Sequence, residues 1–563
     1  MGSMRRSIYL LLGGCWLAAA GVVAGPVRHP GYEPEPAGPA RVLTAEEQAQ
    51  PVRLVPVSPR VRYGRDEVPI LPPSSEGTPL MLRAWRGERV TAQVLAISPK
   101  GFEELTVEPL ELTYADGSKL PVRLDWVRYT LADGKLVADV LDGTAQTRFA
   151  GVTRPLFLSI DVPRDREGMV YGVLTVRING QVCRLPLLLV AGGPVLPPPE
   201  QWQCHVDIWQ HPDAVARWHD VPMWSPEHFA LLKPQMVRLA QLGQKTITAT
   251  LIDEAWDGQT YDRFRSMVEV TRRADGTWAY DYSAFDNWVE FMRREVGLSQ
   301  ATIHCYTMIP WSLRFAYYDE AQGRRVAPKL QPGSAEYADF WEHFLAAFVE
   351  HVRTKGWLEQ VRLAMDERPD HLLRPALEIV RKVAPELKLV AACDRPSELN
   401  SAFADVSYSY GIAEKLFGIA AERRAKGQFT TFYVCCHPAR PNTFMASDLA
   451  ESEWLLPFAA HCGLDGFLRW AYHSWVENPL ASQDYTSWPS GDTALVYPGN
   501  RSSLRLEALR NGIETFEKIR LLRESATPEV LEKVEAALKR FTVPKGGQDG
   551  HLADLEALDK ALP

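Results

Sequence analysis

The sequence lacks the cysteine pattern of a disulfide-rich or zinc-binding protein. Eight cysteines occur in 563 residues, no two of them form a C-x-x-C pair, and only Cys435 and Cys436 are adjacent. Without Cys15, which falls in a predicted leader, the remaining number is odd and the spacing is irregular, so we predict no disulfide framework. We interpret the adjacent pair as two small apolar residues of a buried strand. Since no fourth ligand accompanies them and His437, we expect no metal, and we also expect no cofactor.

The sequence also lacks a cluster of basic residues. The net charge is −8 and the isoelectric point is near 6.0. Without a stretch rich in lysine and arginine, we expect no nucleic-acid partner. Apolar residues make up 46% of the chain and charged residues 23%, a balance that excludes disorder of the whole chain.

Only one long apolar run is present, at residues 8–23, behind Arg5 and Arg6. Small residues precede Gly25, so the run predicts a secretory signal peptide over residues 1–24 rather than a transmembrane span. We therefore expect a bacterial protein that is secreted or periplasmic. Residues 12–15 resemble a lipobox, which leaves lipid anchoring through Cys15 as an alternative to free export.

Aromatic residues, by contrast, are abundant: 17 Trp, 19 Tyr and 20 Phe. Large hydrophobic cores use such residues, and so do sugar-binding sites, where flat rings pack against the faces of pyranoses. Composition alone leaves both interpretations open.

The first third of the chain is typical of a β-sandwich. A proline-rich lead-in over residues 25–80 precedes short β-like segments over residues 81–192, which are separated by turn signals. Asn179-Gly180 is the strongest of these signals, because both positions of a two-residue hairpin favour positive φ. Many short strands without a long helix indicate a sandwich, and the prolines of residues 193–201 predict a stiff linker.

From residue 202 to 525, short apolar runs alternate with helical patterns, which is typical of parallel βα units. A β-hairpin is predicted over residues 267–282, after the second run. Eight runs predict a (β/α)8 barrel of the TIM type, and residues 526–563 predict a short helical tail. The predicted fold is therefore multidomain: an N-terminal β-sandwich is followed by an α/β barrel. The predicted strands cover residues 204–209, 246–252, 301–308, 361–365, 388–393, 406–410, 430–435 and 466–472.

Acidic and aromatic side chains gather where these predicted strands end, as in a carbohydrate-binding pocket. We expect Trp470 and Trp475 to stack on sugar rings, and Tyr410 and Tyr433 to hydrogen-bond an acetamide carbonyl. The remaining candidates bind sugar hydroxyls or only pair with their neighbours. The full set of candidate substrate-binding residues is His205, Asp207, Trp209, Asp394, Tyr408, Tyr410, Tyr433, Arg469, Trp470, Tyr472, Trp475 and Asp492.

The acidic pair Asp366-Glu367 lies at the end of the fourth predicted strand. A conventional retaining glycosidase needs two carboxylates about 5–5.5 Å apart, yet the seventh predicted strand ends without an acid. Substrate assistance, in which a 2-acetamido group attacks its own anomeric carbon, needs one acid/base and one carboxylate that orients the acetamide. Two alternatives stay open: a conventional hydrolase with Asp394 or Asp405 as nucleophile, and an inactive barrel that only binds carbohydrate.

Two stretches of the chain resemble glycoside hydrolase family 123. One is residues 363–369 (LAMDERP), and the other comprises residues 466–472 (GFLRWAY), 488–492 (WPSGD), 497–499 (YPG) and 503–507 (SLRLE). The resemblance covers nearly the whole mature chain. It implies an exo-acting retaining β-N-acetylgalactosaminidase that acts on a glycan by substrate assistance. Asp366 is then expected to orient the acetamide and Glu367 to act as acid/base.

Overall fold

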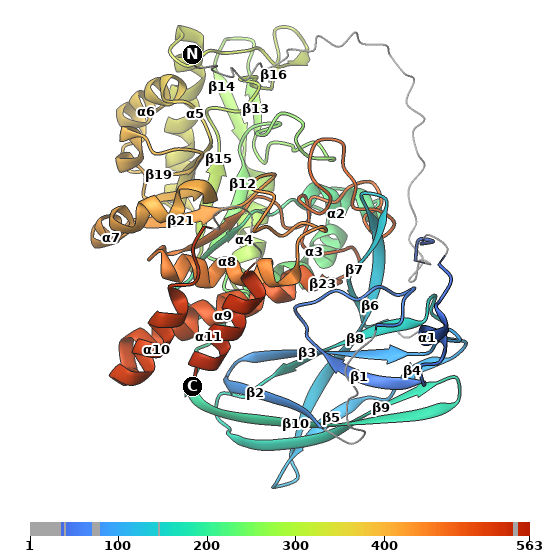
Figure 1. Cartoon of the computed structure of the whole chain (residues 1–563). Helices are drawn as coiled ribbons and strands as arrows, with labels where there is room; N and C mark the ends of the chain where they lie inside the picture. Colours follow the sequence, from blue (N-terminus) through green and yellow to red (C-terminus); the bar gives the residue numbers. More distant parts are fainter. Residues whose placement is uncertain (1–34, 39–40, 70–78, 145–146, 544–549) are drawn as a thin grey trace, which may run out of the picture.

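The computed structural model describes residues 35–38, 41–69, 79–144, 147–543 and 550–563. The predicted signal peptide and Cys15 lie outside these residues. Within them the chain forms a strand-rich N-terminal part and a larger part with a parallel sheet and helices (Figure 1).

The described residues of the N-terminal part form ten strands. β6 runs through both halves of the sheet: its first residues pair with β5, and its later residues pair with β7 and β8. The turn predicted at Asn179-Gly180 is confirmed, with φ of 49° and 82° between β9 and β10. The strands are β1 (Arg53–Val57), β2 (Leu80–Arg86), β3 (Arg89–Ile97), β4 (Leu105–Val107), β5 (Leu110–Tyr114), β6 (Lys119–Ala132), β7 (Lys135–Asp142), β8 (Thr153–Asp161), β9 (Gly168–Ile178) and β10 (Gln181–Val195).

The larger part contains a barrel-like sheet of eight parallel strands, one at each predicted position. Its hydrogen-bonded order is β11-β22-β21-β20-β19-β18-β15-β12. The last strand returns to the first, because Lys245 N donates to Val206 O at 2.9 Å and Ile208 N donates to Gln244 Oε1 at 3.0 Å. The strands are β11 (His205–Ile208), β12 (Thr246–Thr250), β15 (Thr302–Tyr306), β18 (Val361–Asp366), β19 (Lys388–Cys393), β20 (Asp405–Ser409), β21 (Phe429–Tyr433) and β22 (Gly466–Arg469).

Helices follow the strands as the alternating pattern predicts. Serine caps begin two of them: the side chain of Ser225 accepts from His228 N, and that of Ser334 accepts from Tyr337 N. The helices are α1 (Ala45–Gln48), α2 (Pro212–His219), α3 (Pro226–Ala240), α4 (Ser283–Arg294), α5 (Ala335–Thr354), α6 (Asp370–Val383), α7 (Phe417–Ala425), α8 (Leu449–His461), α9 (Leu504–Ser525), α10 (Pro528–Leu538) and α11 (His551–Ala561), with 3-10 turns η1 (Pro199–Gln201), η2 (Glu398–Ala402) and η3 (Tyr410–Leu416).

The hairpin predicted after the second strand is present and belongs to a small separate sheet. β13 (Glu269–Arg272) and β14 (Trp278–Asp281) form the hairpin, and β16 (Tyr317–Asp319) and β17 (Arg324–Val326) extend it in the order β14-β13-β16-β17. The β16–β17 hairpin lies in the long segment after β15. Segments that follow β12 and β15 therefore support one another beyond the carboxyl ends of these strands.

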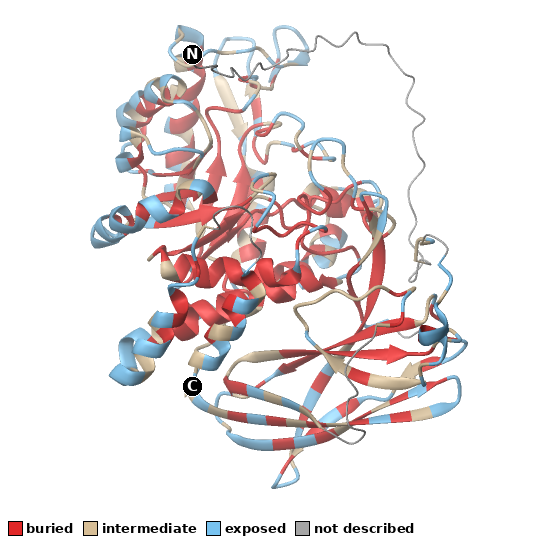
Figure 2. Cartoon of the chain, viewed as in Figure 1, coloured by how far each residue is buried: buried red, intermediate tan, exposed pale blue. Residues whose placement is uncertain are grey.

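Helices α8 and α9 form the buried centre of the molecule (Figure 2). α8 packs against α9, α10 and α11, so both its faces are covered. The short strand β23 (Ser502–Ser503), directly before α9, pairs with β7 of the N-terminal part. This pairing fixes the beginning of α9 to the strand-rich part.

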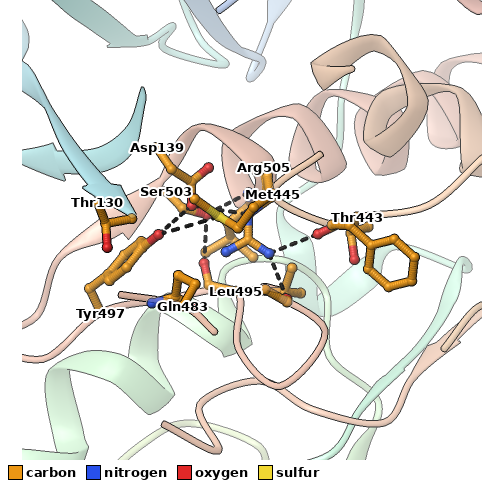
Figure 3. A network of polar contacts seen from close by, with 12 residues as sticks. Thr130, Asp139, Thr443, Met445, Gln483, Leu495, Tyr497, Ser503 and Arg505 are labelled. Atoms are coloured by element: carbon orange, nitrogen blue, oxygen red, sulfur yellow. Dashed lines mark hydrogen bonds and ion pairs between the residues drawn. The ribbon is translucent and has the colours of Figure 1, made fainter. Parts of the chain in front are cut away.

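A buried polar network joins the two parts near the beginning of α9. Figure 3 shows Tyr497 and Arg505 converging on Asp139 of β7. Tyr497 OH donates to Asp139 Oδ2 at 2.6 Å, and Arg505 Nε lies 3.0 Å from the same oxygen. Arg505 Nη1 also donates to the carbonyls of Thr443 and Gly491 at 2.7 and 2.8 Å. An aspartate of the N-terminal part thereby positions two loops of the larger part.

Candidate active site

The acidic pair lies where β18 ends. Asp366 is the last residue of the strand, and Glu367 has a left-handed φ of 46°. Successive strand residues normally point to opposite faces, but this turn brings both side chains into one cavity of about 160 Å³. A non-glycine residue in this conformation costs about 1–3 kcal/mol, and such strain is concentrated at functional sites.

The cavity is lined mainly by aromatic and acidic side chains. It opens at the carboxyl ends of the parallel strands, and its volume is smaller than the roughly 300–1,000 Å³ of sites for drug-sized ligands. A single sugar unit therefore suits it better than a chain of sugars. The lining residues are Trp209, Trp256, Gln259, Trp311, Asp366, Glu367, Ala392, Tyr433, Cys435, Cys436, Leu468, Trp470, Trp488 and Asp492.

Asp366 accepts a hydrogen bond from an indole, and burial and its acidic neighbour raise its pKa. Trp311 Nε1 donates to Asp366 Oδ2 at 3.1 Å, and the guanidinium of Arg368 lies 5.0 Å from the centre of the Trp311 ring. Burial, together with the charge of Glu367, raises the pKa of Asp366 to about 7. Near neutral pH the carboxyl group of Asp366 is thus partly protonated.

Glu367 is held from the opposite side of the cavity by Tyr433, the last residue of β21. The tyrosine hydroxyl donates a hydrogen bond to Glu367 Oε1. Burial raises the pKa of Glu367 above its usual value, and the hydrogen bond from Tyr433 opposes that rise. Two adjacent carboxyl groups with raised pKa values titrate as a pair, so they share one proton over a range of pH.

Asp492 is a third acidic residue of the cavity wall, and it is fully buried. Its Oδ1 forms an ion pair with Arg469 Nη2, while its Oδ2 has no hydrogen-bond partner among the described residues. Arg469 is itself fixed by Val434 O and Thr443 Oγ1 at 3.2 and 3.0 Å. A buried acceptor without a partner costs about 1–3 kcal/mol, and a hydroxyl donor in the cavity removes that cost.

The structure brings six of the predicted site residues to the cavity: Trp209, Asp366, Glu367, Tyr433, Trp470 and Asp492. Sequence reasoning missed Trp256, Gln259, Trp311 and Trp488, all of which lie in loops beyond strand ends. Inspection of those loops for tryptophan would have found three of them. The interpretation of Cys435 and Cys436 as buried strand residues is wrong, because β21 ends at Tyr433 and both thiols line the cavity, half-buried.

The side chains of two predicted site residues on β11 do not line the cavity. His205, the first residue of the strand, lies 2.6 Å from Asp405 Oδ2 through its Nε2, at the amino end of the sheet. Asp207 accepts from Thr246 Oγ1 at 2.6 Å and faces His304. Both side chains are buried and satisfied inside the sheet, so neither is brought to the cavity.

Two predicted tyrosines near β20 also lie away from the cavity. Tyr408 OH donates to Asn400 Oδ1 at 3.1 Å. Tyr410 is already part of η3, since β20 ends at Ser409, and its ring packs 5.1 Å from that of Phe458.

The remaining predicted residues outside the cavity follow β19 and β22. Asp394 is half-exposed and pairs with Arg395. β22 ends at Arg469, earlier than predicted, so the side chains beyond Trp470 turn into the core. Tyr472 donates to Gln235 O at 3.0 Å and Trp475 to Val496 O at 2.8 Å. Arg469 acts on the cavity only through Asp492.

Among the described residues, no group of three or more His, Cys, Asp or Glu side chains is arranged to hold a metal ion. In the same part of the chain, no helix combines the length and apolar character needed to cross a bilayer.

A barrel-like parallel sheet with an acidic pair and tryptophans at its carboxyl end is the arrangement of a glycoside hydrolase. The chain belongs to glycoside hydrolase family 123. The family model described as "Glycoside hydrolase 123, catalytic domain" matches residues 209–522, and "Glycoside hydrolase 123 N-terminal domain" matches residues 57–178. The resemblance found in the sequence is thereby confirmed.

A solved structure of the family agrees with this assignment in its fold. A family 123 glycoside hydrolase from Clostridium perfringens, described for glycolipid glycan hydrolysis, is 22% identical with a TM-score of 0.81, covering 91% of this chain and 97% of that one. A GH20 exo-β-N-acetylglucosaminidase from Vibrio harveyi is 10% identical with a TM-score of 0.27, covering 86% and 97% of the two chains. That second likeness is too low to support an inference. No curated protein matches the sequence.

Proposed function

We propose that the protein is an exo-acting, retaining glycoside hydrolase that releases terminal β-linked N-acetylgalactosamine, or a related N-acetylhexosamine. The observation that carries the proposal is that the adjacent carboxyl groups of Asp366 and Glu367 line one small cavity. β21 ends at Tyr433 and is followed by Val434 and the cysteine pair, where many conventional barrel enzymes have their second catalytic carboxylate. An acetamido group of the substrate supplies the missing nucleophile.

In the first step Glu367 donates its proton to the glycosidic oxygen as the bond to the anomeric carbon breaks. The acetamide carbonyl oxygen attacks that carbon and forms an oxazoline-type intermediate, while Asp366 accepts the hydrogen bond of the acetamide N–H. In the second step Glu367 takes a proton from water. The water oxygen attacks the anomeric carbon from the face that the leaving group had occupied, and the bond from that carbon to the acetamide oxygen breaks. Two inversions at one carbon give net retention.

The shared proton of the acidic pair fits these two roles. The acetamide N–H stabilises the charged form of Asp366, because it donates to it. The proton then resides on Glu367, where the first step needs it. Tyr433 stabilises the carboxylate that remains after the proton has left.

The other cavity residues position the sugar. Asp492 Oδ2, which has no hydrogen-bond partner in the described part of the chain, accepts a sugar hydroxyl. Five tryptophans present flat faces for the apolar side of the ring, with Trp209 and Trp256 stacked at 5.3 Å. A cavity of about 160 Å³ holds one sugar unit, which favours exo action.

The two alternatives have less support. Asp405 lies at the start of β20 in contact with His205, and Asp394 is half-exposed outside the cavity, so neither is placed to attack an anomeric carbon beside Glu367. An inactive binding barrel would not need two half-buried carboxyl groups with raised pKa values. We further propose that the sheet is a (β/α)8 barrel of the TIM type and that the leader exports the enzyme to meet its glycan.

The test is release of nitrophenol from the aryl β-N-acetylgalactosaminide, its gluco epimer and the β-galactoside. We expect cleavage of an N-acetylated sugar only, lost in Glu367→Gln and kept in Glu378→Gln, a change of an exposed glutamate on α6. Equal cleavage of the β-galactoside would contradict substrate assistance. Unchanged activity of Glu367→Gln would contradict the role of that residue.

A further inference from the structure

The adjacent thiols of Cys435 and Cys436 have no role in the proposed reaction, yet they form part of the cavity wall. Their sulfur atoms lie 3.7 Å apart, and both residues are free and half-buried. The same wall contains Glu367 and Asp492. A reactive dithiol is thus placed directly beside the groups that perform the chemistry.

We propose that Cys435 and Cys436 form an oxidation site, which a disulfide oxidant converts to a vicinal disulfide that lowers turnover of the enzyme. The oxidation itself is independent of the proposed function. Only the loss of turnover rests on that function.

The two sulfur atoms are close enough to form a bond after a small movement. A disulfide needs about 2.05 Å between sulfur atoms, so the pair must close by less than 2 Å from 3.7 Å. The contact with Cys435 holds the pKa of the Cys436 thiol below its ordinary value, while the same contact and burial raise that of Cys435. Since the thiolate is the attacking species, Cys436 reacts first.

The chemistry is a double thiol–disulfide exchange. Cys436 Sγ, as thiolate, attacks one sulfur of the oxidant disulfide, forms a mixed disulfide and releases one thiolate of the oxidant. Cys435 then loses its proton and attacks Cys436 Sγ, which releases the second thiolate. The protein loses two hydrogen atoms and two electrons, and the oxidant becomes two thiols.

The resulting bond should be easily reversed. Adjacent α-carbons are about 3.8 Å apart across a trans peptide, whereas disulfides usually join α-carbons about 4.4–6.8 Å apart. A strained disulfide is more readily reduced. A mild reductant should therefore restore the dithiol.

Closure of the disulfide moves the chain next to the catalytic groups. Tyr433, which donates to Glu367, is two residues before the pair, and the carbonyl of Val434 between them accepts from Arg469. Arg469 in turn holds Asp492. A displacement of about 1 Å at such contacts can lower a rate by about a hundredfold, so oxidation is expected to act through these positions.

The other described cysteines are poorly placed for the same reaction. Cys183, Cys204, Cys305 and Cys462 are buried. Cys393 is half-buried, but its sulfur accepts from Asn400 Nδ2 at 3.3 Å and burial raises the pKa of its thiol to about 12. Cys393 is therefore the matched control thiol.

The experiment treats the full chain with oxidised glutathione and follows alkylation of each cysteine, peptide mass and kcat/KM. We expect the peptide with Cys435 and Cys436 to become lighter by two hydrogen atoms and resist alkylation. We expect kcat/KM to fall at least about tenfold and to recover with dithiothreitol. Cys435→Ser should stop at the mixed disulfide, Cys436→Ser should not react, and Cys393→Ser should respond as the unmodified protein does.

Continued alkylation of both thiols after treatment would overturn the proposal, and so would a disulfide that leaves kcat/KM unchanged. If no N-acetylated substrate were cleaved at all, the proposed function would fail, while mass and alkylation would still decide whether the oxidation site exists.

Discussion

Removal of the Tyr433 hydroxyl by Tyr433→Phe tests how the acidic pair is tuned. That hydroxyl donates to Glu367 Oε1 and lowers the pKa of the glutamate. A hydrogen bond to a charged group contributes about 1.5–3 kcal/mol, and one pKa unit corresponds to about 1.4 kcal/mol. With the acetamide bound to Asp366, the last proton of the pair resides on Glu367, so loss of the bond should raise the pKa of that last step by about 1–2 units. The assay is the pH dependence of kcat, which reports the enzyme–substrate complex.

The expected result follows from the role of Glu367 as an acid. Activity is lost at high pH when the last proton leaves, so in Tyr433→Phe the alkaline limb of the profile should move to higher pH. kcat should fall below that limb, because the carboxylate formed in the first step loses a donor. Tyr408→Phe is the control, since its hydroxyl bonds Asn400 on the neighbouring element and not the acidic pair. An alkaline limb that stays in place or moves to lower pH would refute this reasoning.

Three further predictions follow from contacts around the site. Trp311→Phe removes the indole donor to Asp366, so in the enzyme–substrate complex the pKa of that carboxyl should rise and the acidic limb of the kcat profile should move to higher pH; an unchanged limb would exclude an effect of the indole on this pKa. Asp139→Asn leaves the buried Arg505 without its charge partner, so the free energy of unfolding from denaturant titration should fall by about 3–5 kcal/mol. A loss below about 1 kcal/mol would show that the network does not join the two parts. Burial lowers the pKa of His211 to about 3 and that of His473 well below its usual value. Both are neutral when folded, and the unfolded chain takes up protons below about pH 6.5. The contribution of these two histidines to stability is therefore fully present above pH 6.5. Below that value the free energy of unfolding should fall by about 1.4 kcal/mol per histidine for each pH unit. A Tm that stays constant between pH 6.5 and 5 would contradict this.

The eight strands of the parallel sheet could be predicted because each is a short apolar run followed by a helical pattern. The acidic pair was also predictable, since Asp366-Glu367 directly follows one of these runs. What the sequence did not indicate is the left-handed turn at Glu367, which directs both side chains into one cavity. Nothing in residue type predicts positive φ for a glutamate, because the surrounding structure imposes it.

Some residues predicted for the site, among them Tyr410 and Tyr472, lie outside the cavity because their strands end earlier than predicted. β22 ends at Arg469 and β20 at Ser409, so the side chains that follow depart from strand alternation. Tyr410 and Tyr472 therefore pack inward although both carry polar groups. Trp256 and Trp311 enter the cavity from loops that lead into the small β14-β13-β16-β17 sheet, so the paths of these loops depend on tertiary contacts, and sequence periodicity carries no information about such paths.

The central claim is that the acetamide of the substrate is the nucleophile beside Asp366 and Glu367. Its most direct test is kcat/KM for aryl β-galactosaminides whose N-acyl group carries none, one, two or three fluorine atoms. Each fluorine withdraws electrons from the carbonyl oxygen, so a participating acetamide predicts a steep and continuous fall in rate along the series. A rate that stays level across the series would contradict substrate assistance and would require a carboxylate of the protein as the nucleophile.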